Sequence, residues 1–529
     1  MNYRITKKTQ SPLPRVREES QVPKSLTMLN DICQVNLPSI AFEHLHLDSR
    51  KVNNQSVFIA LKGAQFDGRN FIAKAVQQGA VAVLADADES SQHGVRQTVN
   101  SVPVIFIWRL SHLQADIAAC VSQADIAELA LIGVTGTNGK TTVANMVFQA
   151  LLLLDRDAAY VGTLGVQTKH KLQPLLNTTP VAIELHDLLT AIAKQQDVCC
   201  LEVSSHALAE QRIKGLAFQV TAFTNLSHDH LDFHGDMQGY FAAKTKLFSD
   251  YESADVVINL DCSWGQKLAH QVMSGAKSVR VVSRVASDEN SYFLNQTNPH
   301  GRYLIVTQAD AKADGFELSI SSESETASLF LPFYGDFNIE NALVAMACLL
   351  EMNYSLADIA KAFAQVKPIA GRMEHFGKNS QPNVIVDFAH TPDGLEKALV
   401  ACRRHLTEQG QLFVVFGCGG DRDTDKRPVM GQIAAKYADK IFVTNDNSRS
   451  ESPELIAKAI LKGISDQDKQ KVVVELDRKL AIQSAVQAAQ AQDIILVAGK
   501  GHETTQEIAG IKHAYNEREY VQQLMEQAA

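Results

Sequence analysis

The chain has 529 residues, more than a single hydrophobic core accommodates, so we expect several domains. Hydrophobic residues make up 45% of it and charged residues 21%, as in an ordinary globular protein. The formal net charge of −9 favours neither nucleic acid nor an anionic membrane as a partner, so any anionic ligand must be bound by local basic groups.

The cysteines and the apolar runs bear on the compartment. Cys199 and Cys200 are adjacent within an apolar run, and the other cysteines are scattered. This pattern indicates buried free thiols in a reducing compartment, not a disulfide framework or a zinc site. The N-terminus has no apolar stretch of signal-peptide length, and the apolar run Ala150–Leu154 is too short to span a bilayer. We therefore expect a cytoplasmic protein that does not insert into a membrane.

The N-terminal part predicts a leader followed by a small α/β domain. Residues 1–25 are polar and contain prolines, which is typical of a flexible segment. A strand-like run, Val57–Leu61, a helix-period stretch, Ile72–Gln78, and a second strand-like run, Ala80–Leu84, follow. We assign them to a domain over residues 26–127.

A glycine-rich turn after residue 130 predicts an ATP site. The apolar strand that starts at Leu131 leads into this turn, which opens directly into the apolar-periodic helix Val143–Leu154. Glycines let backbone N–H groups surround a polyphosphate, a lysine neutralises its outer oxygens, and a threonine hydroxyl can bind Mg²⁺. The loop is a variant, because Val134 stands where a glycine is usual. An ordinary turn with a solvated lysine is the alternative. The predicted ATP-binding residues of the loop are Gly136, Thr137, Asn138, Gly139, Lys140, Thr141 and Thr142.

The remaining elements predict a central domain over residues 128–368 and a C-terminal domain over residues 369–529. In the central part, Val198–Val203 and Asp255–Leu260 are continuous apolar runs, as in a parallel sheet covered on both faces, and a helix is predicted at Asn338–Glu351. After Gly371, five strands alternate with helical segments: Asn383–Phe388, Gln411–Phe416, Lys440–Thr444, Val472–Glu475 and Asp493–Ala498. We therefore predict an α/β protein of three domains, with a central P-loop-type parallel sheet and a C-terminal doubly wound, Rossmann-like sheet.

The stretch of residues 225–234 is dense in histidine and aspartate, and it has two interpretations. One is a transition-metal hydrolase site, and the other is a magnesium site attached to the ATP loop. Magnesium prefers oxygen ligands, which Thr141 and Glu202 could supply, and His230 could bind a second ion. For each histidine alone, a capping or hydrogen-bonded role without metal is the alternative.

These motifs resemble, in order and over nearly the whole chain, those of the Mur ligases of peptidoglycan synthesis. The motifs that carry the resemblance are GTNGKTT (136–142), EVSSHAL (202–208), NLSHDHLDFHG (225–235), YFAAKTKLF (240–248), GDFNIENALVA (335–345), GRME (371–374), DFAHTPD (387–393), GCGGDRDTDKRP (417–428) and GKGHE (499–503).

The resemblance implies a reaction and its participants. Within the family the chain is similar to members that add the third residue of the stem peptide. It implies ATP-dependent addition of meso-2,6-diaminopimelate to UDP-N-acetylmuramoyl-L-alanyl-D-glutamate, through an acyl phosphate that the amine attacks. The implied cofactor is Mg²⁺, and we expect a monomer. No base that deprotonates the amine is assigned.

The resemblance also assigns roles around ATP. Lys244 matches the lysine that the family carbamylates with CO₂, and the alternative is a plain phosphate-binding ammonium. Asn338 and Asn341 match residues near the adenine and phosphates, although helix capping is an alternative. Arg372 matches a basic residue that reaches the phosphates. The implied catalytic residues are Lys140, Lys244, His230 and Arg372, and the implied metal ligands are Thr141, Glu202, His230 and Lys244.

For the nucleotide-sugar peptide, the matching positions lie in several short segments. Without the family, Asp48 and Ser49 are more simply a helix cap and residues 177–180 a turn. Ala64 departs from the histidine often found in that region. The implied binding residues are Leu47, Ser49, Ala64, Gln65, Phe66, Asn177, Thr178, Thr179, Ser204 and Arg212.

The amino-acid pocket is expected at the carboxyl end of the strand Lys440–Thr444. Arg449 could pair with the distal carboxylate of diaminopimelate, which lysine lacks, and discriminate by about 2–4 kcal/mol. Glu503 would accept from the distal ammonium, although alone it is more simply a solvated carboxylate. Ser448 replaces the proline of diaminopimelate-adding relatives, and we expect a modest effect. The implied pocket residues are Arg422, Asp446, Asn447, Ser448, Arg449, Gly499 and Glu503.

Several alternatives remain open. Within the family they are a lysine-adding ligase, a D-alanyl-D-alanine-adding ligase and a folate-polyglutamating synthetase. Outside it they are a non-catalytic ATP-binding switch and a binuclear metallohydrolase built on residues 228–236. The intact set of Lys140, Glu202, His230 and Lys244 argues against the switch.

Overall fold

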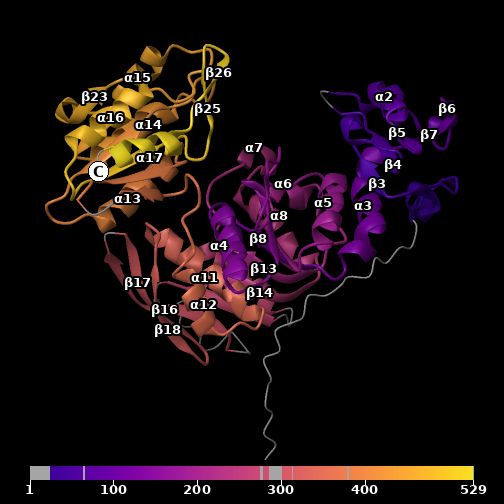
Figure 1. Ribbon diagram of the computed structural model, residues 1–529, viewed down its shortest axis with the longest axis horizontal. Coiled ribbons are helices and arrows are strands. Elements are labelled where there is room, and N and C mark those ends of the chain that lie inside the picture. The colour runs from indigo at the N-terminus through magenta and orange to yellow at the C-terminus, as the bar shows by residue number, and fades with distance from the viewer. Residues whose placement is uncertain are drawn as a thin grey trace, which may run out of the picture. The chain divides into compact units, whose positions relative to one another are not determined.

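The computed structural model describes residues 24–63, 66–274, 278–284, 301–312, 314–377 and 380–527 (Figure 1). The chain forms two compact units, each described here by itself. The first comprises Met1–Ala130, Thr179–Cys199 and His206–Ala217, and the second Leu131–Thr178, Cys200–Ser205 and Phe218–Ala529. The three predicted domain boundaries stay a prediction, and the predicted leader falls almost wholly outside the described residues.

The first unit contains a five-stranded sheet. Its strands, in spatial order, are β3 (His44–His46), β4 (Ser56–Ala60), β5 (Ala82–Ala87), β7 (Val102–Trp108) and β6 (Arg96–Val99). They are parallel except for β6, which pairs antiparallel with β7. The helices of this unit include α1 (Asn30–Cys33), α2 (Ile72–Gln77), α3 (Leu110–Ile126) and α5 (Ala182–Ala193).

Alternate residues of these strands face two different cores. Ile59 and Leu84 pack on the side of α3 and α5, whereas Phe58 and Val83 pack on the side of α2. Because successive side chains of a strand point to opposite faces, both faces of this sheet are buried.

The largest sheet has eleven strands. From β8 through β13, β14, β15 and β16 the neighbouring strands are parallel, and both ends of the sheet are antiparallel. The strands, in spatial order, are β11 (Leu172–Gln173), β10 (Gly165–Gln167), β9 (Ala158–Gly162), β12 (Val198–Glu202), β8 (Ala130–Thr135), β13 (Phe218–Phe223), β14 (Ser253–Asn259), β15 (Ser278–Ser283), β16 (Tyr303–Lys312), β17 (Gly315–Ser322) and β18 (Thr326–Leu331).

Several helices accompany these strands along the chain. The buried residues of α4 and α11 lie on most sides of each helix, as expected for helices inside a large core. These helices are α4 (Lys140–Leu153), α6 (Ser205–Ala209), α7 (Leu231–His234), α8 (Met237–Ser249), α9 (Ser263–Met273), α11 (Asp336–Glu351) and α12 (Leu356–Phe363).

The C-terminal part of the second unit has a six-stranded sheet with helices on both faces (Figure 1). The strands are β19 (Glu374–Phe376), β20 (Asn383–Asp387), β24 (Ile494–Ala498), β21 (Leu412–Phe416), β22 (Lys440–Val443) and β23 (Val472–Val474), and all but β19 pair in parallel. One face is covered by α13 (Pro392–His405), α14 (Lys426–Tyr437) and α15 (Pro453–Leu461). The other is covered by α16 (Arg478–Ala488) and α17 (Glu517–Gln527). The predicted α/β fold with parallel sheets is confirmed.

Individual elements agree with the sequence predictions to within one or two residues for most strands and helices. Helix α11 begins at Asp336, two residues before the predicted start, because Gly335 is its N-cap. The antiparallel strands β16 to β18 were not predicted.

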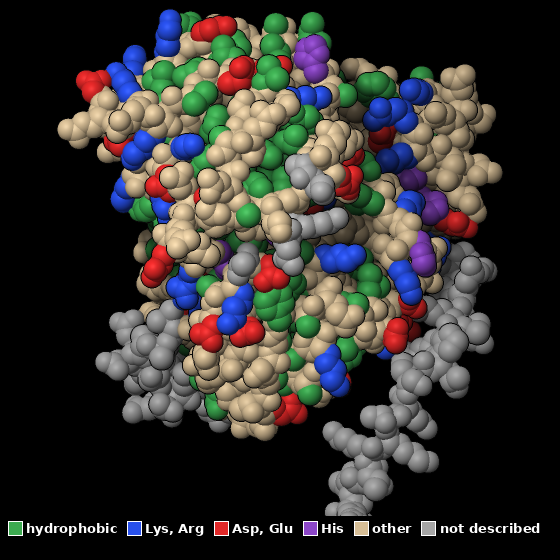
Figure 2. All heavy atoms as spheres, turned by 60° about the vertical axis from the view of Figure 1, so that its left-hand side comes forward, with side chains coloured by type: hydrophobic (Ala, Val, Ile, Leu, Met, Phe, Trp, Pro, Cys, Tyr) green, Lys and Arg blue, Asp and Glu red, His purple; other side chains and the backbone are tan. Residues whose placement is uncertain are grey.

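None of the helices in the described parts of the chain combines the length and the apolar composition that a membrane span requires. Acidic and basic side chains are interspersed on the face shown in Figure 2.

A buried ion pair joins α16 to α17 in the C-terminal sheet layer. Arg478, 2% exposed, donates to both carboxylate oxygens of Glu517 and to the carbonyl of Ala498. Burial alone would lower the pKa of Arg478, but the Glu517 charge raises it. Removing one member of such a pair leaves an uncompensated buried charge.

We therefore predict that Glu517→Gln destabilises the C-terminal sheet by about 3–5 kcal/mol. The measurement is calorimetric thermal unfolding, in which the transition should move to lower temperature. Glu519→Gln is the control, because Glu519 is exposed on the same helix. Equal transition temperatures for both variants would contradict the stabilising role of the pair.

Candidate active site

The glycine-rich loop joins β8 to α4 and is held by the segment that follows β13. Gly136 and Gly139 have φ angles of 152° and 84°. The N–H groups of Thr137 and Asn138 donate to the backbone carbonyl and the side-chain oxygen of Asn225, at 2.8 and 3.0 Å. The loop therefore has a defined shape before any ligand binds, which is what a polyphosphate cradle requires.

Lys140 begins helix α4 and folds back over its own loop. Its Nζ donates to the carbonyl oxygens of Gly136 and Thr137, at 2.9 and 2.8 Å. Burial lowers the pKa of Lys140 and the charge of Arg372 lowers it further, whereas Glu202 and Asp229 raise it. These effects on the pKa of Lys140 show that the charged side chains of Glu202, Asp229 and Arg372 lie near the loop.

Glu202 lies at the carboxyl end of β12 and is fully buried. It accepts hydrogen bonds from the Thr141 hydroxyl at 3.0 Å, from the Thr163 N–H at 2.9 Å and from the Tyr160 hydroxyl. A threonine hydroxyl next to a carboxylate is a donor set that fits magnesium. Tyr160 was not predicted, because nothing in its apolar strand signals a functional hydroxyl.

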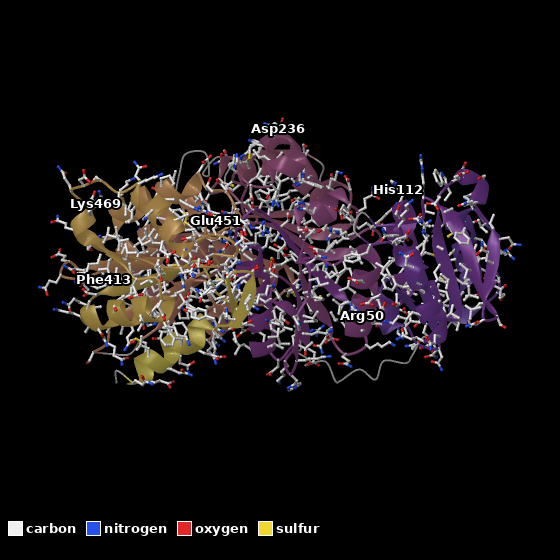
Figure 3. The ribbon with its side chains drawn as sticks, turned by 90° about the horizontal axis from the view of Figure 1, so that it is seen from above. Arg50, His112, Asp236, Phe413, Glu451 and Lys469 are labelled. Carbon is white, nitrogen blue, oxygen red and sulfur yellow. The ribbon has the colours of Figure 1, made fainter. Side chains whose placement is uncertain are left out.

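Lys244 lies on α8, a helix whose first turn is capped by Asp236 (Figure 3). The side chain is 1% exposed, and its Nζ donates to the carbonyl of Gly136 at 2.8 Å. It also lies 4.7 Å from the centre of the Tyr240 ring. Burial holds the pKa of Lys244 well below its usual value, and the positive charge of Lys140 lowers it further, with Asp229 opposing. A lowered pKa raises the share of the neutral, nucleophilic amine at this position.

His230 and His234 gather around the same tyrosine. His234 stacks on Tyr240 with ring centres 5.0 Å apart and bonds to Ser205 Oγ at 3.0 Å. The ring of His230 is edge-on to Tyr240, and its Nε2 lies 3.4 Å from Asp229 Oδ2. Within the described part of the chain, no group of three or more His, Cys, Asp or Glu side chains could hold a metal ion.

Asn338 and Asn341 lie in the first turns of α11 and are both buried. Asn338 donates to the carbonyl of Tyr334 at 2.8 Å and accepts from Asn341 at 3.1 Å. The N-cap is Gly335, so the capping alternative for Asn338 is wrong. A Cβ added at Gly139 would collide with Asn341 Oδ1, which shows that Asn341 reaches the nucleotide loop.

Arg372 follows Gly371 at the start of the C-terminal sheet region. Its guanidinium lies 4.8 Å from the centre of the Phe388 ring. Its charge contributes to the lowered pKa of Lys140, so it acts on the same site as the loop.

Thr142, the last of the predicted loop residues, is half-buried in the first turn of α4.

Several of the residues predicted to bind the nucleotide-sugar peptide belong to the first unit. Asp48 caps a short helix by accepting from the Arg50 N–H at 2.9 Å, so the cap alternative is confirmed for Asp48. Leu47 is half-buried and Ser49 is buried beside it. Phe66 is 75% exposed. Ala64 and Gln65 lie outside the described residues.

Arg212 lines a pocket of ≈ 490 Å³ in the first unit, with His112 on the α3 side (Figure 3). Arg212 donates to the carbonyl of Thr179 at 2.6 Å and pairs with Glu210. In the second unit, Asn177 is exposed, Ser204 is half-buried and Thr178 lies 3.1 Å from the Thr163 hydroxyl. Because these residues belong to both units, their joint binding of one substrate stays a prediction.

The predicted amino-acid pocket lies at the carboxyl ends of β21, β22 and β24. Arg449 has a left-handed φ of 51° and donates to the carbonyl of Gly420 at 2.6 Å. A Cβ at Gly419 would lie 3.0 Å from Arg449 NH1 and 3.9 Å from Arg422 Cγ, so the two arginines flank one turn. Arg422 is exposed.

Two buried oxygens of the pocket have no hydrogen-bond partner among the residues that the structure describes. They are Asp446 Oδ2 and Ser448 Oγ. Gly499, at φ 117°, approaches so closely that a Cβ there would lie 2.5 Å from Asp446 Oδ2. Buried polar atoms normally have partners, so these two indicate a place for a ligand or water.

Glu503 is not a solvated surface carboxylate, so that alternative is wrong. It accepts from Asn447 Nδ2 at 3.0 Å and from Lys500 Nζ at 2.7 Å. Burial would raise the pKa of Glu503, but the bond and charge of Lys500 lower it overall. Lys500 was missed as a site residue, although its place in GKGHE was a signal.

A pair of residues that was also not predicted, Arg427 and Glu451, links two loops of this pocket. Arg427, on α14, donates to both oxygens of Glu451, at 2.9 and 2.8 Å, and to the carbonyl of Gly419 (Figure 3). The Glu451 carboxylate also accepts from the N–H of Asp421 at 2.6 Å. This ties the loop after β21 to the loop that carries Arg449.

Comparison with known proteins decides the family. Residues 41–119, 134–349 and 371–501 match the Mur ligase family catalytic domain, the Mur ligase middle domain and the Mur ligase glutamate ligase domain. The UDP-N-acetylmuramoyl-L-alanyl-D-glutamate--2,6-diaminopimelate ligase of Vibrio parahaemolyticus is 39% identical over 491 residues, 93% of this chain and 96% of that protein. The chain belongs to the Mur ligase family. It is an ATP-dependent ligase.

Other relatives agree with this assignment. The ligase of the same name from Haemophilus influenzae is 38% identical over 482 residues, 91% of this chain and 95% of that protein. A solved structure with that name is 29% identical, with a TM-score of 0.68, and covers 96% of this chain and 99% of that chain. The Thermotoga maritima MurF ligase, solved with ADP, is 18% identical with a TM-score of 0.62 and covers 92% and 97%, which shows the same fold.

For this Mur ligase we predict that Gly139→Ala weakens ATP binding at least about tenfold. The left-handed φ of 84° costs an alanine about 1–2 kcal/mol, and its Cβ would collide with Asn341. The measurement is titration calorimetry with a non-hydrolysable ATP analogue.

Gly510→Ala is the matched control. It has a φ of 75° and nothing within 4 Å of the added Cβ. If both variants bind the analogue like the parent protein, the loop geometry does not serve the nucleotide.

Proposed function

We propose that this Mur ligase joins meso-2,6-diaminopimelate to UDP-N-acetylmuramoyl-L-alanyl-D-glutamate. The observation that carries the choice of amino acid is that Arg449 and Glu503 both lie on loops at the carboxyl ends of neighbouring parts of one sheet, after β22 and β24. The distal end of diaminopimelate bears a carboxylate and an ammonium, and this pocket offers one group of each opposite charge. The printed names of the most similar relatives support the same substrates.

ATP would lie on the glycine-rich loop, with Lys140 and Arg372 near its phosphates and Asn338 and Asn341 near its adenine and phosphates. Thr141 and Glu202 would hold Mg²⁺, because a hydroxyl and a buried carboxylate oxygen are adjacent there. When bound, the metal ion would neutralise phosphate charge. The protein itself supplies fixed N–H groups and two cations, which position the transferring group.

Lys244 is proposed to carry a carbamate. The lowered pKa of Lys244 raises the share of the neutral amine, whose nitrogen can attack CO₂ and lose one proton. The product is an anion at the end of a buried side chain, and it would give the Lys140 ammonium an attractive counter-charge at Gly136. His230 is proposed to assist this group in metal binding.

The reaction needs two steps, because a carboxylate oxygen is a poor leaving group. The substrate carboxylate attacks the γ-phosphorus of ATP, giving an acyl phosphate and ADP. The amine nitrogen then attacks the acyl carbon, phosphate leaves, and the nitrogen loses a proton. Lys140 and Arg372 would stabilise the negative charge that moves onto the leaving oxygens.

The remaining assignments rest on the sequence. The residues proposed to bind the nucleotide-sugar peptide are Leu47, Ser49, Ala64, Gln65, Phe66, Asn177, Thr178, Thr179, Ser204 and Arg212. A monomer and a cytoplasmic location stay predictions.

A phosphate-release assay with three amines tests the function. We expect turnover with meso-diaminopimelate and little with lysine or D-alanyl-D-alanine. Arg449→Ala should raise the KM for diaminopimelate about 30-fold or more, the equivalent of about 2 kcal/mol, and leave the KM for the nucleotide-sugar peptide nearly unchanged. Preference for lysine, or an equal loss for both substrates, would show that the pocket has been assigned wrongly.

The carbamate is tested at Lys244. We predict that Lys244→Ala stays folded but loses nearly all turnover, and that added formate or acetate partly restores it. Lys246→Ala, two residues along the same helix, is the control and should remain active. Undiminished turnover of Lys244→Ala would remove the basis for the carbamate.

A further inference from the structure

Lys500 is a fully buried ammonium beside the predicted amino-acid pocket. It follows β24, has no exposed surface, and donates to Asn447 Oδ1 at 3.1 Å and Glu503 Oε2 at 2.7 Å. Its Nζ lies 6.0 Å from the centre of the Tyr515 ring. Burying an ammonium is costly unless it is paired, so these two contacts have a structural reason to persist.

The two partners of Lys500 also bond to each other. Asn447 Nδ2 donates to Glu503 Oε2 at 3.0 Å, and Asn447 Oδ1 accepts from the N–H of Glu507 at 2.9 Å. Three segments are thereby joined: the loop after β22, the loop after β24, and β25 (Thr505–Ile508). Arg449 belongs to the first of these loops and its N–H donates to the carbonyl of Glu507.

The network treats the two oxygens of Glu503 differently. Among the described residues, the hydrogen bonds to this carboxylate reach Oε2, from Lys500 and Asn447. The side chain is 33% exposed. One oxygen is therefore held from the protein side, and the other can face a ligand.

We propose that Lys500 is a positioning residue of the amino-acid pocket. Lys500 holds Glu503 ionised and in one orientation, so that the second oxygen of Glu503 accepts a hydrogen bond from the ammonium of the incoming amino acid. This inference rests on the proposed function. In this proposal Lys500, the lysine of GKGHE, acts through Glu503 and does not itself contact the substrate.

Burial raises the pKa of Glu503, but the titratable side chains of Lys500 and His502 and the bond from Asn447 lower it overall. Because the pKa of Glu503 is lowered, the carboxylate is ionised at neutral pH, and binding of an ammonium is lost as the pH falls through that pKa. Without the Lys500 charge, the same loss should begin at higher pH.

The test compares Lys500→Met, Lys500→Arg and Glu503→Gln in the full-length enzyme. For Lys500→Met we expect the KM for diaminopimelate to rise about tenfold or more, with the KM values for ATP and the nucleotide-sugar peptide within about twofold of the parent values. The acidic limb of kcat/KM for diaminopimelate should move up by about one pH unit. Lys500→Arg should keep the limb where it is.

The double variant with Glu503→Gln isolates the coupling. If Lys500 acts through Glu503, Lys500→Met should add little to the KM change of Glu503→Gln. Additive changes, an unmoved acidic limb, or an equal rise of all three KM values would each overturn the proposal. If Lys500→Met does not fold, a displaced limb in Lys500→Arg overturns it.

The parent enzyme is assayed first with diaminopimelate and with lysine. Turnover with lysine alone would contradict the proposed function. The Lys500 profiles would then be recorded with lysine, whose side-chain ammonium still requires an ionised acceptor, and they would decide the role of Lys500 separately.

Discussion

Two lysine side chains, the half-buried Lys140 and the buried Lys244, share one carbonyl oxygen at the nucleotide loop, and the chemistry of the site depends on how their charges are accommodated. Lys140 and Lys244 both donate to the carbonyl of Gly136. Burial lowers the pKa of both, and the charge of Lys140 lowers that of Lys244 further. Two ammonium charges so close together, away from water, are unfavourable. The arrangement therefore favours one cation and one neutral amine, which gives the same residue type two different roles.

This constraint connects parts of the chain that are far apart in sequence. Gly136 follows β8, Lys140 begins α4, and Lys244 lies 108 residues after the shared carbonyl. Asn225, which holds the loop, follows β13, the strand that pairs in parallel with β8. The parallel sheet thus brings the carboxyl ends of its strands, and the groups that follow them, to one edge.

The sequence could predict what depends on local pattern. Apolar runs located β20, β21, β22 and β24, and the glycine turn located the nucleotide loop, because strand burial and turn geometry are set by neighbouring residues. The partners of Glu202 could not be predicted in full. Tyr160 lies 42 residues earlier in an apolar strand, and only the folded sheet shows that its hydroxyl turns to this carboxylate. The brace between Arg427 and Glu451 escaped prediction for the same reason.

The loop that carries Arg449 shows how tertiary contacts can replace local stiffness. Ser448 stands where the resemblance led us to expect a proline, and it is fully buried. Its carbonyl accepts from the N–H of Glu451 at 2.9 Å, and the Gly420 N–H donates to the carbonyl of Asn447 at the same distance. Arg427 holds Glu451 from the other side. The loop is thus tied on both sides of Arg449, which is consistent with a modest effect of the lost proline.

Lys244 and Lys500 show that burial alone does not decide what a lysine does. Their exposures are 1% and 0%, so desolvation bears on both. Lys244 donates to a neutral carbonyl beside a second cation, an environment that disfavours its charge. Lys500 instead donates to the carboxylate of Glu503, which compensates its charge. The difference lies in the hydrogen-bond partner, because a buried amine that donates to a neutral carbonyl can lose its charge and react, whereas a buried ammonium bonded to a carboxylate keeps its charge and holds that carboxylate in place.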